Sequence, residues 1–343
     1  MRNSTIHGAR VLLLGASALA VGLFMQPDQA SARDVRVAHH YVQKSIQGDV
    51  DQSFADDVNA NTDLNVQIFW SGALGSGREI VDLVGGGAVE MGATVPSYTP
   101  AKLTIGSIGT VPMLYFDTPE IALAITREVL ADPAAVAEYE RANLEPLVLH
   151  TTAPYRLVCN KPVETMADFQ GLKVRTFGAL ASKALAPLGA VSVTMTSAET
   201  YEALQRSTVQ CAMYSSEFAI AQKLHEVAKF WTTLTFGAFS GAHLYANRDF
   251  MASLSPETAA AVRAAGRKAE QGEVALNMAA EAGAVETARA AGVTMVEFKE
   301  TEQFVKALPD TLEMWVEDAV AAGVAKEDAE RIASIIRQKS GKN

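Results

Sequence analysis

Arg175 is the residue of this sequence best suited to bind a small anion. It ends the short run Lys173-Val174-Arg175, which has the composition of a β-strand. A guanidinium is planar, stays charged at any working pH and donates two parallel hydrogen bonds to a carboxylate, most strongly where water is excluded. An isolated arginine at the end of a strand is usually a surface residue, so the role of Arg175 depends on the sequence around it.

His39, His40 and Tyr41 follow the first predicted strand, at the strand end where α/β folds commonly bind ligands. Adjacent side chains on a strand point to opposite faces, which argues against a metal site made by the two histidines. We therefore predict that one histidine, His40, faces the ligand and that the other packs inside. Tyr98 and Phe236 are further candidates to line a cleft, although aromatic side chains of this kind are more often in the core.

The sequence lacks the motifs that indicate an enzyme or a cofactor site. It has no G-x-S-x-G elbow and no H-E-x-x-H, and the glycines at 72, 75 and 77 do not have the spacing of a dinucleotide loop. Its two cysteines, Cys159 and Cys211, do not have the spacing of a metal site. We predict a binding protein without cofactor or metal. An oxidising compartment would allow the cysteines to pair, which the sequence neither requires nor excludes.

The N-terminus has the pattern of a secretory signal peptide. Arg2 and Arg10 precede the apolar run from Val11 to Met25, and Ala30-Ser31-Ala32 supplies a small-residue cleavage site. An uncleaved membrane anchor is the alternative, but the apolar run is shorter than the roughly 20 residues that a spanning helix needs. We expect cleavage after Ala32, a mature protein that is not embedded in the membrane, and a location in a bacterial periplasm.

The charge balance argues against nucleic acid as a partner. The formal net charge is −10, the pI is about 5.2, and the mature chain has no basic cluster that could neutralise a phosphate backbone.

Short β-like runs alternate with amphipathic helical runs from Asp34 onward, which is the pattern of α/β folds with largely parallel sheets. A chain of 343 residues exceeds what one hydrophobic core usually supports, so two lobes are expected. An Ala-rich helical run from Pro256 to about Ala291 is long enough to bridge both lobes. The predicted lobes comprise residues 33–153 with 238–277 and residues 154–237 with 278–343, after a signal peptide over 1–32.

Six short motifs occur in order along most of the mature chain. They are L-G-S-G-R-E at 74–79, G-A-V-E-M at 87–91, N-K-P-V at 160–163, M-A-D-F-Q-G-L-K-V-R at 166–175, L-G-A at 188–190 and E-T-Y-E-A-L-Q at 199–205. In this order they resemble the motifs of the substrate-binding subunit of tripartite ATP-independent periplasmic (TRAP) transporters, of the C4-dicarboxylate-binding type.

The resemblance implies the two-lobed α/β fold of periplasmic binding proteins, with hinge strands between the lobes, a long helix spanning both and closure around a ligand. It implies that Arg175 holds a ligand carboxylate in a bidentate ion pair. Arg156 matches the family's second arginine, which implies a contact with the carboxylate or another polar group; a bridge between hinge strands is the alternative. The implied partners are a small carboxylate and a TRAP membrane permease.

The sequence departs from the family pattern after A-L-Q. Tyr214 stands where the family has an Asn that contacts the ligand, Gln210 stands where it has an Asp, and Ser197 replaces an aromatic residue before the E-x-Y motif. A phenol in place of an amide narrows the pocket and adds a stacking face. We therefore expect Tyr214 and Ser197 to line the pocket of an organic acid that is neither a C4-dicarboxylate nor sialic acid and that has an apolar or ring portion.

The sequence thus predicts an extracytoplasmic solute-binding protein that captures a small carboxylate by hinge closure and delivers it to a permease. Two alternatives remain. A ligand-sensing protein would dock to a signalling receptor, and a periplasmic enzyme on a bilobal fold would convert its ligand chemically.

Overall fold

The structure is a computed structural model that describes residues 32–110 and 115–342, all within one compact unit, Ala32–Asn343. The predicted signal peptide, except for Ala32, lies outside the described residues. Among the residues described, no helix combines the length and the apolar character needed to cross a membrane.

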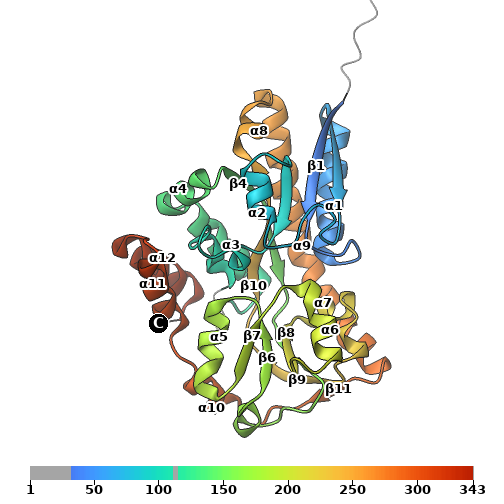
Figure 1. Ribbon diagram of the computed structural model, residues 1–343, viewed down its shortest axis with the longest axis vertical. Helices are drawn as coiled ribbons and strands as arrows, with labels where there is room; N and C mark the ends of the chain where they lie inside the picture. Colours follow the sequence, from blue (N-terminus) through green and yellow to red (C-terminus); the bar gives the residue numbers. More distant parts are fainter. Residues whose placement is uncertain (1–31, 111–114, 343) are drawn as a thin grey trace, which may run out of the picture. The chain divides into compact units, whose positions relative to one another are not determined.

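The first of two sheets has the strand order β2-β1-β3-β10-β4 (Figure 1). Its strands are β1 (Arg33–His39), β2 (Leu64–Phe69), β3 (Met91–Thr94), β4 (Leu144–Thr152) and β10 (Phe239–Asn247). β1 runs parallel to β2 and β3, whereas β10 runs antiparallel to β3 and β4. The sheet is therefore largely parallel, as expected, with β10 as its one antiparallel strand, because β10 returns from the second sheet and enters between β3 and β4.

The second sheet has the order β11-β9-β5-β8-β6-β7. Its strands are β5 (Arg156–Cys159), β6 (Lys173–Thr176), β7 (Val191–Thr194), β8 (Cys211–Tyr214), β9 (Phe230–Thr235) and β11 (Thr294–Val296). β6 runs parallel to β7 and β8, and β5 runs antiparallel to β8 and β9. The sequence patterns predict strands over 155–160, 173–175, 191–195 and 209–214, which correspond to β5, β6, β7 and β8, but they do not predict β9 or β11.

Helices connect and cover these strands. They are α1 (Ile46–Asn61), α2 (Ile80–Gly85), α3 (Pro119–Leu130), α4 (Pro133–Arg141), α5 (Ala179–Leu185), α6 (Thr200–Gln205), α7 (Ser216–Ala221), α8 (Arg248–Ala252), α9 (Pro256–Ala290), α10 (Thr301–Ala307), α11 (Thr311–Ala321) and α12 (Lys326–Ser340). Local chemistry sets several of the starts. Thr118 and Ser255 accept hydrogen bonds from backbone N–H groups of the first turns of α3 and α9, and each precedes a proline at the first helical position.

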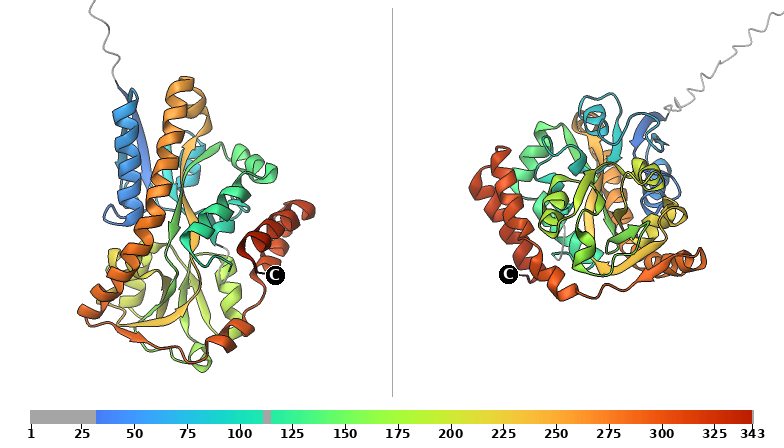
Figure 2. Two further views of the ribbon diagram at one scale, coloured as in Figure 1. Left: turned by 180° about the vertical axis from the view of Figure 1, so that it is seen from behind. Right: turned by 60° about the horizontal axis from the view of Figure 1, so that its bottom comes forward.

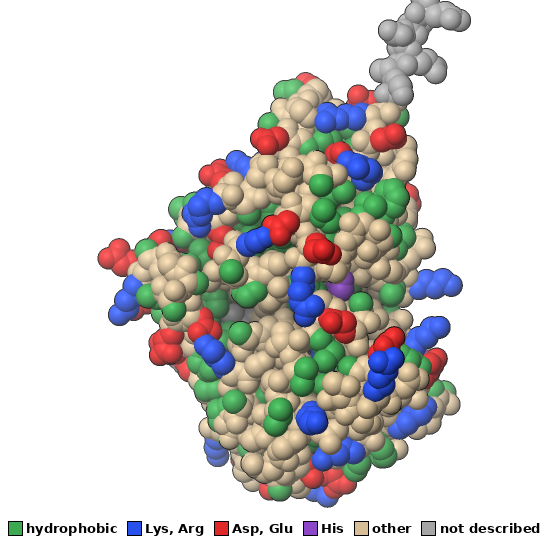
Figure 3. All heavy atoms as spheres, in the orientation of Figure 1, with side chains coloured by type: hydrophobic (Ala, Val, Ile, Leu, Met, Phe, Trp, Pro, Cys, Tyr) green, Lys and Arg blue, Asp and Glu red, His purple; other side chains and the backbone are tan. Residues whose placement is uncertain are grey.

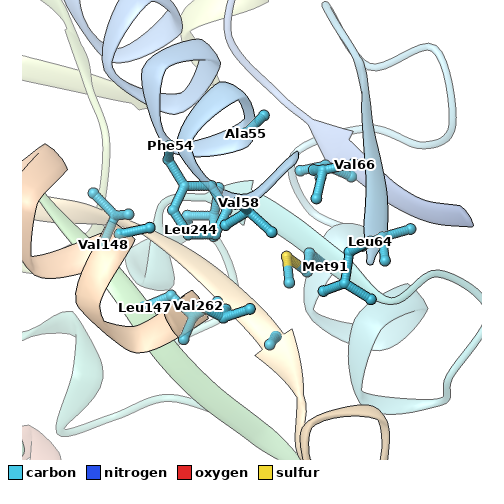
Figure 4. Close-up of a cluster of buried hydrophobic side chains, with 14 of the residues drawn as sticks. Phe54, Ala55, Val58, Leu64, Val66, Met91, Leu147, Val148, Leu244 and Val262 are labelled. Atoms are coloured by element: carbon cyan, nitrogen blue, oxygen red, sulfur yellow. The ribbon is translucent and has the colours of Figure 1, made fainter. Parts of the chain in front are cut away.

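The core of the first lobe lies between its sheet and the helices α1 and α9 (Figure 4). Val50, Phe54 and Val58 recur every four residues and so share one face of α1. In the same cluster, Val262 of α9 and Leu244 of β10 are fully buried. Burying side chains of this size stabilises the fold by about 1.5–3 kcal/mol each.

The second sheet is covered on both faces by separate hydrophobic clusters. One contains Val174 with Phe304 of α10, and the other contains Trp231 with Phe218 of α7. The two C-terminal helices belong to a third cluster, in which α12 packs against α3 and against α11; α11 also contacts α5.

Two chain crossings and one helix join the sheets. The crossings run side by side, since Tyr155 N–H donates to Gly237 O at 2.9 Å and Phe236 N–H donates to Tyr155 O at 2.8 Å. The 35-residue helix α9 packs against α1 and β4 at the first sheet and against α7 at the second (Figure 2). It contains Gly272 and Gly283, where an added Cβ would meet no atom within 4 Å.

A disulfide joins Cys159 and Cys211, which are directly paired positions of the neighbouring strands β5 and β8. Both cysteines are fully buried. The two residues are 52 positions apart in the sequence, so the bond restricts a long loop of the unfolded chain.

Replacing both cysteines by serine (Cys159→Ser with Cys211→Ser) should lower the free energy of unfolding by about 2–4 kcal/mol, because the unfolded chain regains the entropy of that loop. Urea unfolding of the oxidised protein, the dithiothreitol-treated protein and the double variant measures the effect. Equal midpoints for all three proteins would show that the bond contributes nothing to stability.

Candidate functional site

The guanidinium of Arg175 is buried where the two lobes meet, and the residue is only 2% exposed. Nε donates to Met195 O at 3.2 Å, and Cζ lies 4.9 Å from the ring centre of Tyr214 and 5.6 Å from that of Phe177. In the part of the chain that the structure describes, no Asp or Glu forms an ion pair with Arg175. A buried charge without a counter-ion is costly, so this position favours an anionic ligand.

Arg175 keeps its proton despite this burial. Burial acts to lower its pKa, but the phenol groups of Tyr214, Tyr98 and Tyr155 outweigh burial, and the pKa is raised above the usual value. A positive charge is therefore present at every pH at which the protein works.

A cavity of about 40 Å³ adjoins Arg175. Both lobes contribute to its lining, which consists of Tyr41, Val95, Tyr98, Thr110, Thr152, Tyr155, Arg175, Phe177, Ser197, Phe218, Phe239, Gly241 and Ala242. Three of the predicted site residues, Arg175, Tyr98 and Ser197, are thus brought together around one cavity. A separate cavity of about 250 Å³ shares Thr110 and Phe177 with it.

Three hydrogen bonds connect the two lobes at the edge of this cavity. Ser97 Oγ donates to Phe177 O at 2.7 Å, and the backbone N–H of Ser197 donates to the Tyr98 hydroxyl at 3.1 Å. His40 Nε2 and Ser197 Oγ share a hydrogen bond of 2.9 Å. The lobes are therefore closed over the cavity in this structure.

His39 and His40 point to different surroundings, as the strand alternation predicts. His40 reaches Ser197, whereas His39 Nε2 lies 2.7 Å from Asp51 Oδ2 inside the first lobe. Burial, with smaller contributions from His39 and Arg175, lowers the pKa of His40 to about 3. His40 is thus a neutral imidazole and adds no second positive charge near the cavity.

A buried ionic cluster holds the strand end that carries His40. It joins Asp51 of α1 to His39 of β1 and His150 of β4, and His150 Nδ1 lies 3.0 Å from Glu273 Oε1 of α9. All four side chains are fully buried. Burial acts to lower the pKa of His150, but the two carboxylates outweigh burial and raise it well above 6.5.

The same cluster keeps Asp51 ionised. Burial acts to raise its pKa, but the charge on His150 and the hydrogen bonds from both imidazoles outweigh burial and lower it from 3.8 to about 2. Because the folded state binds a proton here less readily than the unfolded state, this contribution to stability is present above pH 3.8 and is lost as the pH falls towards 2.

Asp51→Asn should lower the free energy of unfolding by about 3–5 kcal/mol at pH 7, because it leaves a buried imidazolium partly unpaired. The difference between the variant and the wild type should shrink as the pH falls from about 4 towards 2, where the wild type also loses this charge. Thermal unfolding by circular dichroism across this pH range checks both points. Asp56→Asn, at an exposed position of α1, is the matched control; a difference that stays constant with pH would contradict the assignment.

Four predicted site residues, His40, Tyr214, Arg156 and Phe236, do not line the cavity. Tyr214 is fully buried behind Arg175, where its hydroxyl bonds to Thr200 Oγ1 at 2.9 Å. Phe236 is fully buried and packs against Phe304 of α10.

Arg156 lies at the junction of β5, α9 and α7. Its Nη2 donates to Glu281 Oε1 at 2.9 Å, and Glu281 Oε2 accepts the backbone N–H of Ser216 at 2.8 Å. Arg156 also donates to Thr232 O of β9 at 3.2 Å. It therefore bridges β5, β9 and α9, which agrees with the alternative of a structural bridge between hinge strands.

Glu217 is a buried carboxyl beside that bridge. It accepts a hydrogen bond from Ser215 Oγ at 3.0 Å. Burial, together with the nearby charges of Glu281 and Glu273, raises its pKa from 4.5 to about 8. Because the folded state holds this proton more tightly than the unfolded state, its contribution to stability is fully present below pH 4.5 and is lost as the pH rises through about 8.

Glu217→Gln should therefore gain stability relative to the wild type as the pH rises from 5 to 8.5, since the amide has no proton to lose. The melting temperatures of both proteins at several pH values test this. Glu202→Gln, at an exposed position of α6, should show no such trend. A difference between Glu217→Gln and wild type that does not grow with pH would mean that Glu217 is already ionised when the protein is folded.

Sequence reasoning missed most of the aromatic lining. Tyr155 and Phe239 flank the two chain crossings, Phe177 follows directly after β6, and Phe218 lies on α7. The position of Phe177 could have been predicted from the sequence, because it follows directly after the strand that carries Arg175, and ligands commonly bind at such strand ends. The others are brought to the cavity by the crossings and by a helix that the patterns did not predict.

The described residues, 32–110 and 115–342, include no group of three or more His, Cys, Asp or Glu side chains that could hold a metal ion.

Two lobes joined by crossing strands, with an unpaired buried cation in a cavity between them, define a solute-binding protein. The chain belongs to family 7 of the bacterial extracellular solute-binding proteins, whose family model matches residues 37–318. Members of this family bind small solutes outside the cytoplasm and work with membrane permeases.

Curated relatives and a solved structure agree with this family. The chain is 24% identical over 241 residues to the ectoine/5-hydroxyectoine-binding periplasmic protein UehA of Ruegeria pomeroyi, which covers 69% of this chain and 71% of the relative. It is 25% identical over 294 residues to the 2,3-diketo-L-gulonate-binding periplasmic protein YiaO of Escherichia coli, with coverages of 84% and 88%. The ectoine-binding protein of the TeaABC TRAP transporter of Halomonas elongata superposes with a TM-score of 0.80 at 21% identity, over 90% of this chain and 99% of that structure.

Proposed function

We propose that this protein captures a small organic carboxylate with Arg175 in the periplasm and delivers it to the membrane permease of a TRAP transporter. One observation carries the proposal: a fully charged guanidinium is buried at a cavity between two lobes, and no carboxylate of the described chain forms an ion pair with it. Such a group gains most from a ligand that supplies the missing negative charge.

The relatives support this chemistry. The Escherichia coli relative binds 2,3-diketo-L-gulonate, a carboxylate, and the Ruegeria pomeroyi relative binds ectoine and 5-hydroxyectoine. The front face in Figure 3 carries interspersed acidic and basic side chains. It has no continuous basic surface of the kind that binds a polyanion, which agrees with a small solute as the ligand.

Hinge closure is the proposed mechanism of capture. The lobes separate at residues 153/154 and 237/238, where the two crossings lie, and the cavity is complete only when both lobes contribute to it. A ligand that contacts both lobes binds the closed form more tightly than the open form and shifts the population towards closure. The closed form is the one that we propose the permease recognises.

We propose binding without chemical conversion. The Ser197–His40 hydrogen bond could suggest a nucleophile with its base. However, an imidazole with a pKa of about 3 is too weak a base to take a hydroxyl proton at neutral pH. The pair acts instead as a contact between the lobes.

Arg175→Ala should weaken carboxylate binding by about 2–5 kcal/mol, since the ligand loses its buried partner. Isothermal titration calorimetry against a panel of organic acids measures this, and NMR of the recovered acid should show it unchanged. Arg175→Met keeps the packing against Tyr214 and should lose the same affinity, whereas Arg206→Ala, at an exposed position after α6, should lose little. Unchanged affinity in both Arg175 variants would refute the site.

A further inference from the structure

We infer that the ligand is a monocarboxylate with a small, planar and mostly apolar body. The inference rests on the proposed function, because it takes Arg175 as the group that binds the carboxylate. It follows from the charge, the hydrogen bonds and the shape of the cavity lining.

The charge of the lining permits one carboxylate. Arg175 is the sole cationic residue among the described residues that line the cavity, and the others are neutral. His40, which lies behind Ser197, is also neutral. A second carboxylate on the ligand would be buried without a partner, which costs far more than one exposed to water.

Four of the six hydroxyl groups of the lining are engaged by the protein itself, whereas those of Tyr41 and Tyr155 form no hydrogen bond with the described residues. Thr110 Oγ1 donates to Ser107 O at 2.6 Å, and Thr152 Oγ1 accepts the backbone N–H of Phe239 at 3.3 Å. The Ser197 and Tyr98 side chains take part in the contacts between the lobes. A ligand with many hydroxyls would therefore find partners for only one or two of them and would lose its other bonds to water without replacement.

Aromatic side chains form much of the remaining wall. Six of the lining residues are aromatic: Tyr41, Tyr98, Tyr155, Phe177, Phe218 and Phe239. They already pack on one another edge to face, with ring centres 4.6 Å apart for Tyr155 and Phe239 and 5.6 Å apart for Tyr41 and Phe218. A planar ring inserted among them gains stacking and edge contacts beyond its buried area.

The size of the cavity also favours a planar body. At about 40 Å³ it holds about three water-sized spheres, which is less than a ring acid occupies. The lobes must therefore close less far around the ligand than they do here. Because a flat ring is the thinnest body of its area, it separates the lobes least and preserves most of the contacts at the edge.

The test uses calorimetry on the mature protein with two matched series of acids. Benzoate, cyclohexanecarboxylate and glucuronate compare a flat ring, a puckered ring and a hydroxylated ring. Butanoate and succinate compare one carboxylate with two on a chain of equal length. We expect benzoate to bind most tightly of the rings, glucuronate about tenfold or more weaker than cyclohexanecarboxylate, and succinate about 30-fold or more weaker than butanoate.

Variants of the aromatic wall give a second readout. Phe218→Leu removes a ring that lines the cavity and should weaken benzoate more than butanoate. Phe236→Leu, which alters a buried ring outside the cavity, should leave the ratio of the two affinities unchanged. If Phe218→Leu fails to fold, the two acid series on the wild type still decide the question.

The outcomes separate the two proposals. Binding of succinate or glucuronate as tight as that of its matched partner, and lost in Arg175→Met, overturns the inferred ligand class and leaves the proposed function standing. If no carboxylate of either series binds, the proposed function and the inference both fail.

Discussion

The fold of this protein is organised around one buried guanidinium. Burial opposes the positive charge of Arg175, but the tyrosines around it outweigh burial. The guanidinium also donates to the backbone carbonyl groups of Met195 and Met213 and lies over the rings of Tyr214 and Phe177. Dipoles and aromatic rings hold a cation in place without neutralising it. A carboxylate side chain in the same position would have stabilised the fold more and left nothing for a ligand to add. No described residue supplies such a carboxylate, and this distinguishes the surroundings of Arg175 from a structural ion pair.

Other buried charges of the protein differ from Arg175, because they have partners of opposite charge. Arg156 has Glu281 as its partner, and His150 lies between Asp51 and Glu273. These pairs are complete within the chain, and each ties α9 to a strand of one lobe. Burial alone therefore does not identify a ligand site here, because buried charges occur in both lobes. The informative feature is a buried charge that lacks its partner.

The sequence predicts much of the fold but only part of the candidate site. The sequence predicts helices over 119–130, 133–141 and 256–291, each with a proline at its first position. These ranges match α3 and α4 to the residue and α9 to within one residue. The short β9 and β11 were missed, since their pairing partners come from distant parts of the chain. Motif order singled out Arg175, which lines the cavity, and strand alternation separated His39 from His40. Sequence spacing could not show that Tyr214 lies behind the guanidinium, because that depends on how β8 packs beside β6.

The helix α9 has a mechanical consequence. Glu273 fixes it to the first lobe and Glu281 fixes it to the second, and only about two turns of helix separate these attachment points. The lobes therefore cannot swing freely about the crossing strands. Any change in the angle between them must bend the helix between Glu273 and Glu281 or break one of these two attachments. In the proposed hinge motion, opening therefore strains this helix, and the strained helix acts to return the lobes to the closed arrangement.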